Sequence, residues 1–127
     1  MYGPIEEVAI ATADFEESFE FYESLGFETD RLNETEGFVT PSEGSISVYI
    51  FETDGEGRRV RTPEVRTNPP GLDHLSVEVD DADAVYEDLS RKGITVVKEP
   101  TTYDDQDIRL TAVRDPDGTL VYFVADV

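Results

Sequence analysis

The residues best suited to chemistry in this sequence are a single histidine and a few acids and tyrosines. His74 is the only histidine among 127 residues, and cysteine is absent. Disulfides, thiolate zinc sites and a cysteine nucleophile are therefore excluded, and any metal must be held by histidine, carboxylate or other oxygen ligands. Glu7 lies 67 residues before His74, an offset that recurs elsewhere in the chain. A glutamate and a histidine that face each other would form a proton-transfer or hydrogen-bonding pair.

Both residues lie in segments of alternating polarity. Residues 5–11 and 72–79 each place an apolar row on one side of a predicted strand. Because side chains alternate between the two faces of a strand, Glu7 in the first segment and His74 in the second lie on the opposite, polar side. The two residues therefore occupy equivalent places in two similar strands.

An amphipathic helix follows each strand. Asp14 caps the first helix, predicted over about residues 15–25, and Asp80 or Asp81 caps the second. A glycine ends each helix, as expected where the backbone needs a positive φ. The terminating glycines are Gly26 and Gly93. The residues predicted to face inward are Phe15, Phe19 and Tyr22, and then Ala82, Val85, Tyr86 and Leu89.

Three short strands follow each helix, so the sequence predicts an α+β fold made of two βαβββ modules. The strands are expected at 27–32, 37–40 and 46–51, and then at 94–98, 108–113 and 120–124. Asp14 and Asp81, like Gly26 and Gly93, are also 67 residues apart, which indicates a duplicated module. We predict one domain over 1–127, with modules at about 4–52 and 71–126 and a linker at 53–70 rich in glycine and proline.

The composition describes an acidic folded protein. There are 30 acids against 10 lysines and arginines, for a net charge of −20, which argues against nucleic acid and anionic membranes as partners. The acids are spread along the chain together with six tyrosines and seven phenylalanines, unlike a disordered acidic tail. We interpret this charge as the surface of a protein from a halophile, and the alternative is an ordinary acidic protein from a mesophile. The sequence shows no membrane span or signal peptide, so we expect a cytoplasmic protein.

Three features occur together along the whole chain. They are the paired βαβββ modules, the helical run over residues 14–27, and two turn or strand-opening motifs, Gly71-Leu72-Asp73-His74 and Asp115-Pro116-Asp117-Gly118. In this combination the chain resembles the vicinal-oxygen-chelate superfamily of glyoxalase I, bleomycin-resistance proteins and extradiol dioxygenases. The resemblance implies that each module curls its sheet into a half-barrel with the helix outside. It does not imply one reaction, because unrelated chemistries share this scaffold.

Metal enzymes of that superfamily place one ligand on the first and one on the last strand of each module, facing a shared cavity. The resemblance carries the first-strand positions to Glu7 and His74, and the last-strand positions to Tyr49 and Tyr122. A neutral phenol is a poor ligand for a hard divalent ion, and two ligands fall short of the usual three or four. The sequence therefore predicts an incomplete metal site of Glu7 and His74, unless a tyrosine ionises on the metal.

Without metal, the same positions predict a ligand pocket. Glu7 and His74 would act as an acid–base or hydrogen-bonding pair, and the tyrosines would supply flat walls and phenolic donors. The ligand-binding candidates are Tyr49, Tyr122, Ser47, Ser76 and Arg109. A purely structural interpretation stands beside this one, in which Glu7 and His74 satisfy each other and the tyrosines pack in the core.

The linker carries a group of arginines that allows several interpretations. The group consists of Arg58, Arg59, Arg61 and Arg66. It could form an anion-attracting lid beside the cavity, a hinge that pairs with acids of a second subunit, or a solvated loop. Arg109 could face either the cavity or the outer side of its strand.

Two functions follow from these alternatives. The first is the binding or sequestration of a small molecule in a cavity between the modules, without turnover. The second is a divalent-metal-dependent lyase, isomerase or dioxygenase that acts on a small substrate through Glu7 and His74. Because relatives commonly pair their modules between chains, and because an open half-barrel leaves sheet edges to bury, we expect a homodimer.

Overall fold

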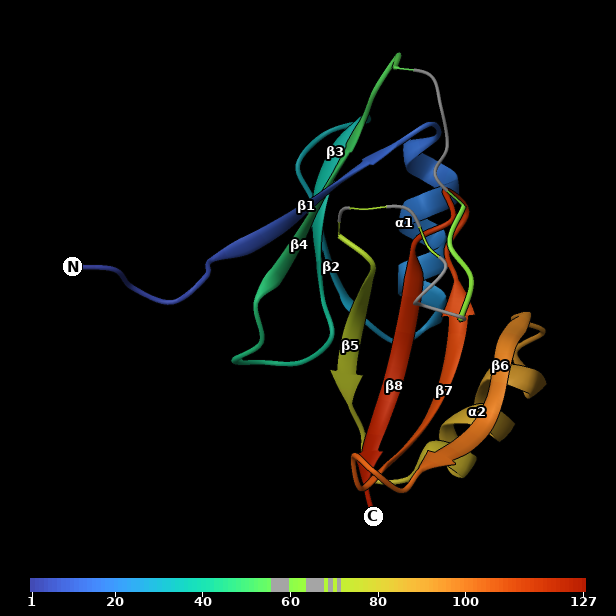
Figure 1. Cartoon of the computed structure of the whole chain (residues 1–127). Helices are drawn as coiled ribbons and strands as arrows, with labels where there is room; N and C mark the ends of the chain where they lie inside the picture. Colours follow the sequence, from blue (N-terminus) through green and yellow to red (C-terminus); the bar gives the residue numbers. More distant parts are fainter. Residues whose placement is uncertain (56–59, 64–67, 69, 71) are drawn as a thin grey trace. The chain divides into compact units, whose positions relative to one another are not determined.

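The computed structural model describes residues 1–55, 60–63, 68, 70 and 72–127, and the chain divides into two compact units, Met1–Gly57 and Arg58–Val127 (Figure 1). Each described unit contains a four-stranded mixed sheet and one helix. The elements of the first unit are β1 (Glu7–Thr12), α1 (Phe15–Ser24), β2 (Glu28–Arg31), β3 (Glu36–Thr40) and β4 (Ser47–Glu52). Those of the second are β5 (His74–Glu78), α2 (Ala82–Arg91), β6 (Val96–Tyr103), β7 (Ile108–Arg114) and β8 (Leu120–Asp126).

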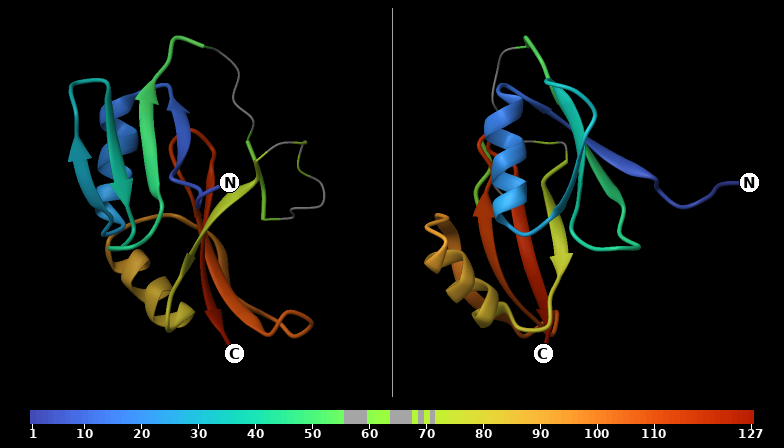
Figure 2. Two further views of the ribbon diagram at one scale, coloured as in Figure 1. Left: turned by 90° about the vertical axis from the view of Figure 1, so that its left-hand side faces the viewer. Right: turned by 180° about the vertical axis from the view of Figure 1, so that it is seen from behind.

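The two sheets have the same topology. The strand order is β1-β4-β3-β2 in the first unit and β5-β8-β7-β6 in the second. In each sheet the first strand of the module pairs in parallel with the last, and the remaining pairs are antiparallel. Figure 2 shows each helix running along one face of its own sheet. The predicted α+β fold of two βαβββ modules is therefore confirmed.

Helix α1 forms as its sequence predicts. Asp14 is the N-cap, and its carboxylate accepts a hydrogen bond from the N–H of Glu17 at 3.2 Å. Gly26 follows the helix with φ of +97°. This conformation is unfavourable for any residue that has a side chain, so glycine is preferred there. The aromatic residues predicted to face the core are buried: Phe15, Phe19 and Tyr22.

Asp81 is the N-cap of helix α2, which decides between the two predicted caps. The Asp81 carboxylate accepts hydrogen bonds from the N–H groups of Asp83 and Ala84 at 3.0 and 3.1 Å. Of the residues predicted to face inward, Ala82 and Leu89 are buried, and Val85 and Tyr86 are half-buried.

Strand β6 is longer than predicted. The sequence places its end at Lys98, before Glu99-Pro100, but the strand continues to Tyr103. The register against β7 shifts between Val96 and Lys98 and again between Lys98 and Thr101. Such irregularities accommodate Pro100, which has no N–H to donate, and the ladder of hydrogen bonds continues beyond it.

The part of the chain between β4 and β5 that the structure describes contains no helix or strand. No helix within the described ranges is both long enough and apolar enough to cross a membrane.

Candidate functional site

The sheet of the second unit has one face toward α2 and one face away from it. Arg109 of β7 lies on the face toward α2, because its guanidinium bonds Asp83 of that helix. Its register partner on β8, Ala125, lies on the same face. Since strand side chains alternate, Tyr122 of β8 lies on the face away from the helix. Tyr122 belongs to a buried cluster on that face. The cluster is Leu110, Ala112, Leu120 and Tyr122, with Val97, Tyr103, Ile108 and Val124 packed against it.

His74, at the start of β5, stacks on Tyr122. The centroids of the two rings are 4.1 Å apart, and their planes differ by 10°. Tyr122 is 7% exposed, whereas the side chain of His74 is 31% exposed. Ser76 is the register neighbour of Tyr122 and shares the face. Three predicted site residues of this unit, His74, Ser76 and Tyr122, are therefore brought together.

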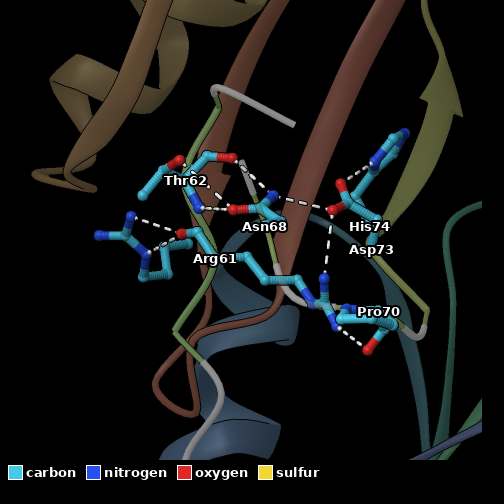
Figure 3. A network of polar contacts seen from close by, with 7 residues as sticks. Arg61, Thr62, Asn68, Pro70, Asp73 and His74 are labelled. Atoms are coloured by element: carbon cyan, nitrogen blue, oxygen red, sulfur yellow. Dashed lines mark hydrogen bonds and ion pairs between the residues drawn. The ribbon is translucent and has the colours of Figure 1, made fainter. Parts of the chain in front are cut away.

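A carboxylate that the sequence analysis did not select holds the imidazole. Nδ1 of His74 lies 2.7 Å from Oδ1 of Asp73 (Figure 3). The other oxygen, Oδ2, accepts a hydrogen bond from Nδ2 of Asn68 at 2.8 Å and lies 3.3 Å from NH1 of Arg61. Burial, the largest single effect, raises the pKa of Asp73, but the bonds from His74 and Asn68 and the charges of His74 and Arg61 together lower it. Asp73 is thus stabilised as a carboxylate.

Arg61 is an interior residue of the second unit. It is 6% exposed, and its guanidinium reaches Asp73 and donates to the carbonyl of Pro70 at 3.4 Å. Its own carbonyl accepts two hydrogen bonds from the guanidinium of Arg114, at 3.2 and 2.8 Å. The solvated-loop interpretation is therefore wrong for Arg61. The other three linker arginines lie outside the described residues: Arg58, Arg59 and Arg66.

In the first unit, Tyr49 lies on the sheet face away from α1. Its strand neighbours Val48 and Ile50 are buried toward the helix, and Tyr49 shares the other face with Ser47 and Glu7, which are partners across β1 and β4. Three aromatic rings follow one another on this face. The ring of Tyr49 lies 5.2 Å from that of Phe38 and 5.6 Å from that of Phe51.

A second carboxylate, Glu36, binds the hydroxyl of Tyr49. The hydroxyl donates to Oε1 of Glu36 at 3.0 Å. This hydrogen bond, then partial burial and the charges of Glu36 and Glu7, raise the pKa of Tyr49. Tyr49 is therefore held as a neutral phenol, and Glu7 lies close enough to contribute to that effect.

The donors within each unit do not fit a metal ion. Among the described residues there is no group of three or more histidines, cysteines or acids that could hold one. A ligated metal lies in the imidazole plane at about 2 Å from nitrogen, whereas a stacked ring is displaced by roughly 3.5 Å. Tyr122 therefore cannot share a metal with His74 in this stack. The raised pKa of Tyr49 disfavours the phenolate that a metal would need.

Arg109 is directed away from these side chains. Nε and NH2 of its guanidinium bond the carboxylate of Asp83 at 2.8 and 2.9 Å, and NH1 donates to Thr102 at 2.9 Å. The Asp83 hydrogen bond is the main reason that the pKa of Arg109 is raised. Arg109 therefore links β7 to α2.

Sequence reasoning missed Asp73, Asn68 and Glu36. Asp73 is adjacent to His74, and neighbouring residues of a strand point to opposite faces, so the alternation argued against a contact. The strand begins at His74, however, which leaves Asp73 outside that rule. Asn68 lies in the linker, where no periodicity applies. Glu36 could have been found, because it opens β3 on the same face as Tyr49.

Comparison with known proteins establishes the superfamily to which the chain belongs. The family model described as the Glyoxalase/Bleomycin resistance protein/Dioxygenase superfamily matches residues 5–123. The chain belongs to this superfamily, which confirms the resemblance seen in its sequence. Among curated proteins it is similar to the uncharacterized protein YraH of Bacillus subtilis (strain 168), with 31% identity over 120 residues, covering 91% of this chain and 92% of YraH.

Solved structures agree with the fold. The structure of SMU.1112c is 28% identical with a TM-score of 0.76, and the match covers 98% of this chain and 99% of that one. A superfamily member from Sphaerobacter thermophilus DSM 20745 is 24% identical with a TM-score of 0.72, and covers 98% of each chain. The second similarity concerns the fold alone.

Proposed function

We propose that this protein binds a small molecule on the face of the second unit that carries His74, Ser76 and Tyr122. The observation that carries the proposal is the stack, in which a partly exposed imidazole rests on a buried phenol and is fixed by Asp73. A rigid aromatic floor with a polar edge favours a ligand that has a planar or apolar part and at least one polar group. Membership of a superfamily whose members bind small molecules supports the same conclusion.

The first unit offers a second surface of related chemistry. Tyr49 with Phe38 and Phe51 forms an aromatic row, and Glu7 and Ser47 lie on the same face. We propose that this surface also contacts a ligand. Tyr49→Phe should weaken any ligand that hydrogen-bonds the phenol while keeping the aromatic row.

Two substitutions of His74 test the main proposal. His74→Phe keeps a ring over Tyr122 but removes both nitrogens, whereas His74→Ala removes the stack as well. Glu87→Gln is the control, because Glu87 is an exposed residue of α2, which lies on the other face of the sheet. A library of planar polar fragments is screened by ligand-observed NMR, and hits of the wild type should bind His74→Ala most weakly and Glu87→Gln normally.

The outcome also separates binding from a structural role. If His74→Ala lowers the melting temperature but binds every fragment as the wild type does, the pair of His74 and Asp73 is structural and the proposal is wrong. Loss of binding by a variant that melts near the wild-type temperature supports the proposal.

Among the described residues no group of three or more histidines, cysteines or acids supports a divalent-metal-dependent lyase, isomerase or dioxygenase acting through Glu7 and His74. Elemental analysis of protein purified without an affinity tag tests for such a metal. A stoichiometric divalent ion that is lost in both Glu7→Gln and His74→Ala would favour the metal-dependent enzyme instead.

We also propose that the protein is a homodimer. In each described sheet the outer strands pair on one side only, β1 and β2 in the first and β5 and β6 in the second. Open strand edges are commonly covered by a second chain. Light scattering in molar salt, where charge repulsion is screened, should give twice the 14.2 kDa mass of the chain. A monomer at every protein concentration would contradict this.

A further inference from the structure

The hydrogen bonds around Asp73 determine where the proton of His74 must be. Oδ2 of Asp73 faces two groups that can only donate, the amide NH2 of Asn68 at 2.8 Å and the guanidinium of Arg61 at 3.3 Å. A proton on Oδ2 would oppose both donors. The same donors, together with the bond from His74, lower the pKa of Asp73 and keep it ionised. Oδ1 is then an acceptor as well, and it requires a donor from His74.

The orientation of the Asn68 amide is itself fixed. Its Oδ1 accepts from the backbone N–H of Thr62 at 2.9 Å, and its Nδ2 donates to the carbonyl of Thr62 at 2.9 Å. Turning the amide over would place NH2 against N–H and oxygen against oxygen. Asn68 can therefore present only its NH2 to Asp73, as drawn in Figure 3.

The segment that carries Arg61 and Thr62 is also anchored. The carbonyl of Arg61 accepts two hydrogen bonds from Arg114 at the end of β7. A continuous chain of contacts thus runs from the sheet through the linker to Asp73 and the imidazole. As far as Asp73, every link in it has one donor and one acceptor whose roles cannot be exchanged.

We propose that Asp73 is a positioning residue that fixes His74 in the Nδ1–H tautomer, so that Nε2 presents a lone pair and selects ligands carrying a hydroxyl or N–H donor. The inference rests on the proposed function and adds the class of ligand. Within the described residues, Nε2 has no hydrogen-bond partner, and Figure 3 shows it directed away from Asp73. The second nitrogen of a neutral imidazole accepts when the first donates.

The tautomer can be measured directly, because the chain has one histidine and its ring signals need no assignment. Nitrogen-15 NMR of the wild type, recorded at a pH where the ring is neutral, should show a protonated Nδ1 and an unprotonated Nε2. Asp73→Ala should shift the population toward the Nε2–H form. Asp105→Ala, which removes the same charge from an exposed turn of the unit, should leave the tautomer unchanged. The wild-type spectrum decides the question even if Asp73→Ala does not fold.

Phenol and anisole test the ligand class, since they share a planar ring but only phenol has a donor. Phenol should bind the wild type about 3- to 10-fold more tightly than anisole, which is the value of one hydrogen bond. Its binding should change the nitrogen-15 chemical shift of Nε2 more than that of Nδ1. In Asp73→Ala this preference should fall toward none.

The possible results separate this inference from the proposed function. An Nε2–H tautomer in the wild type overturns the inference whatever binds. Equal binding of phenol and anisole at His74 also overturns it, but supports the proposed function. An Nδ1–H tautomer with no perturbation of His74 by either probe overturns the ligand selection together with the proposed function.

Discussion

The hydroxyl of Tyr49 donates a 3.0 Å hydrogen bond to Glu36 between the neighbouring strands β4 and β3. Because the neutral phenol is the form that donates, the bond raises the pKa of Tyr49 in the folded chain. A group that binds its proton more tightly when folded stabilises the protein below its unfolded pKa, about 10 for tyrosine. This contribution is lost as the pH rises through the folded pKa.

We therefore expect the wild type to lose stability more steeply than Tyr49→Phe as the pH rises above about 10. Urea unfolding of both proteins at several pH values measures the difference. Glu36→Gln is the control. Because it removes the charge beside the phenol, its stability should fall less steeply with pH than that of the wild type. Identical pH dependence in the wild type and Tyr49→Phe would mean that the bond does not control the titration.

The cap of α2 gives a second prediction. Asp81→Ala removes the acceptor for two N–H groups and should lower the free energy of unfolding by about 1 kcal/mol. Asp80→Ala, one residue earlier, changes the charge equally without touching the cap and should cost much less. Chemical unfolding at molar salt compares the two. Equal losses would show that charge rather than capping is responsible.

Gly37 provides a packing prediction. A methyl group at this position would meet the carbonyl oxygen of Asp30 at 2.9 Å and the ring of Phe19 at 3.0 Å. Because backbone cannot give way cheaply, Gly37→Ala should destabilise the first unit by about 1–3 kcal/mol. Gly3→Ala has nothing within 4 Å of the new methyl and serves as the control. Thermal unfolding of both variants is the measurement, and a wild-type midpoint for Gly37→Ala would contradict the clash.

The net charge of −20 predicts stability that depends on salt. Raising KCl from about 0.1 M to 1 M shortens the Debye length from about 10 Å to about 3 Å, which weakens repulsion among the acids. The melting temperature should therefore rise with KCl near neutral pH. The same series near pH 4, where about half of ordinary carboxylates are protonated, should show a smaller rise. A melting temperature that stays constant or falls with KCl at neutral pH would show that repulsion among the acids does not limit stability.

The elements of the fold were predictable because their signals are local. Asp14 and Gly26 mark the two ends of α1, and the spacing of its aromatic residues identifies the buried side. The paired choice of Asp80 or Asp81 shows the limit of this reasoning. Both are aspartates before the same helix, and only backbone geometry decides which carboxylate reaches the free N–H groups.

The surroundings of His74 were predictable only in part. Alternation placed His74 on the polar face of its strand, the family resemblance placed Tyr122 at the same cavity, and the structure stacks the two rings. The partners of Asp73 come from the linker, and their contact depends on the path of a segment without periodicity. Arg61 illustrates the same difficulty, because an arginine in a glycine-rich and proline-rich stretch is normally exposed.

The anchoring of Arg61 has a consequence for where the second module can be cut from the chain. Its first strand begins at His74, but the contacts that complete it begin at Arg61, within a unit that starts at Arg58. A fragment starting at Leu72 would contain all four strands and the helix, yet it would lack the donors to Oδ2 of Asp73 and the carbonyl that Arg114 binds. The boundary between the duplicated halves is therefore displaced from the sequence repeat, and the described contacts of Arg61 and Asn68 belong to the C-terminal half.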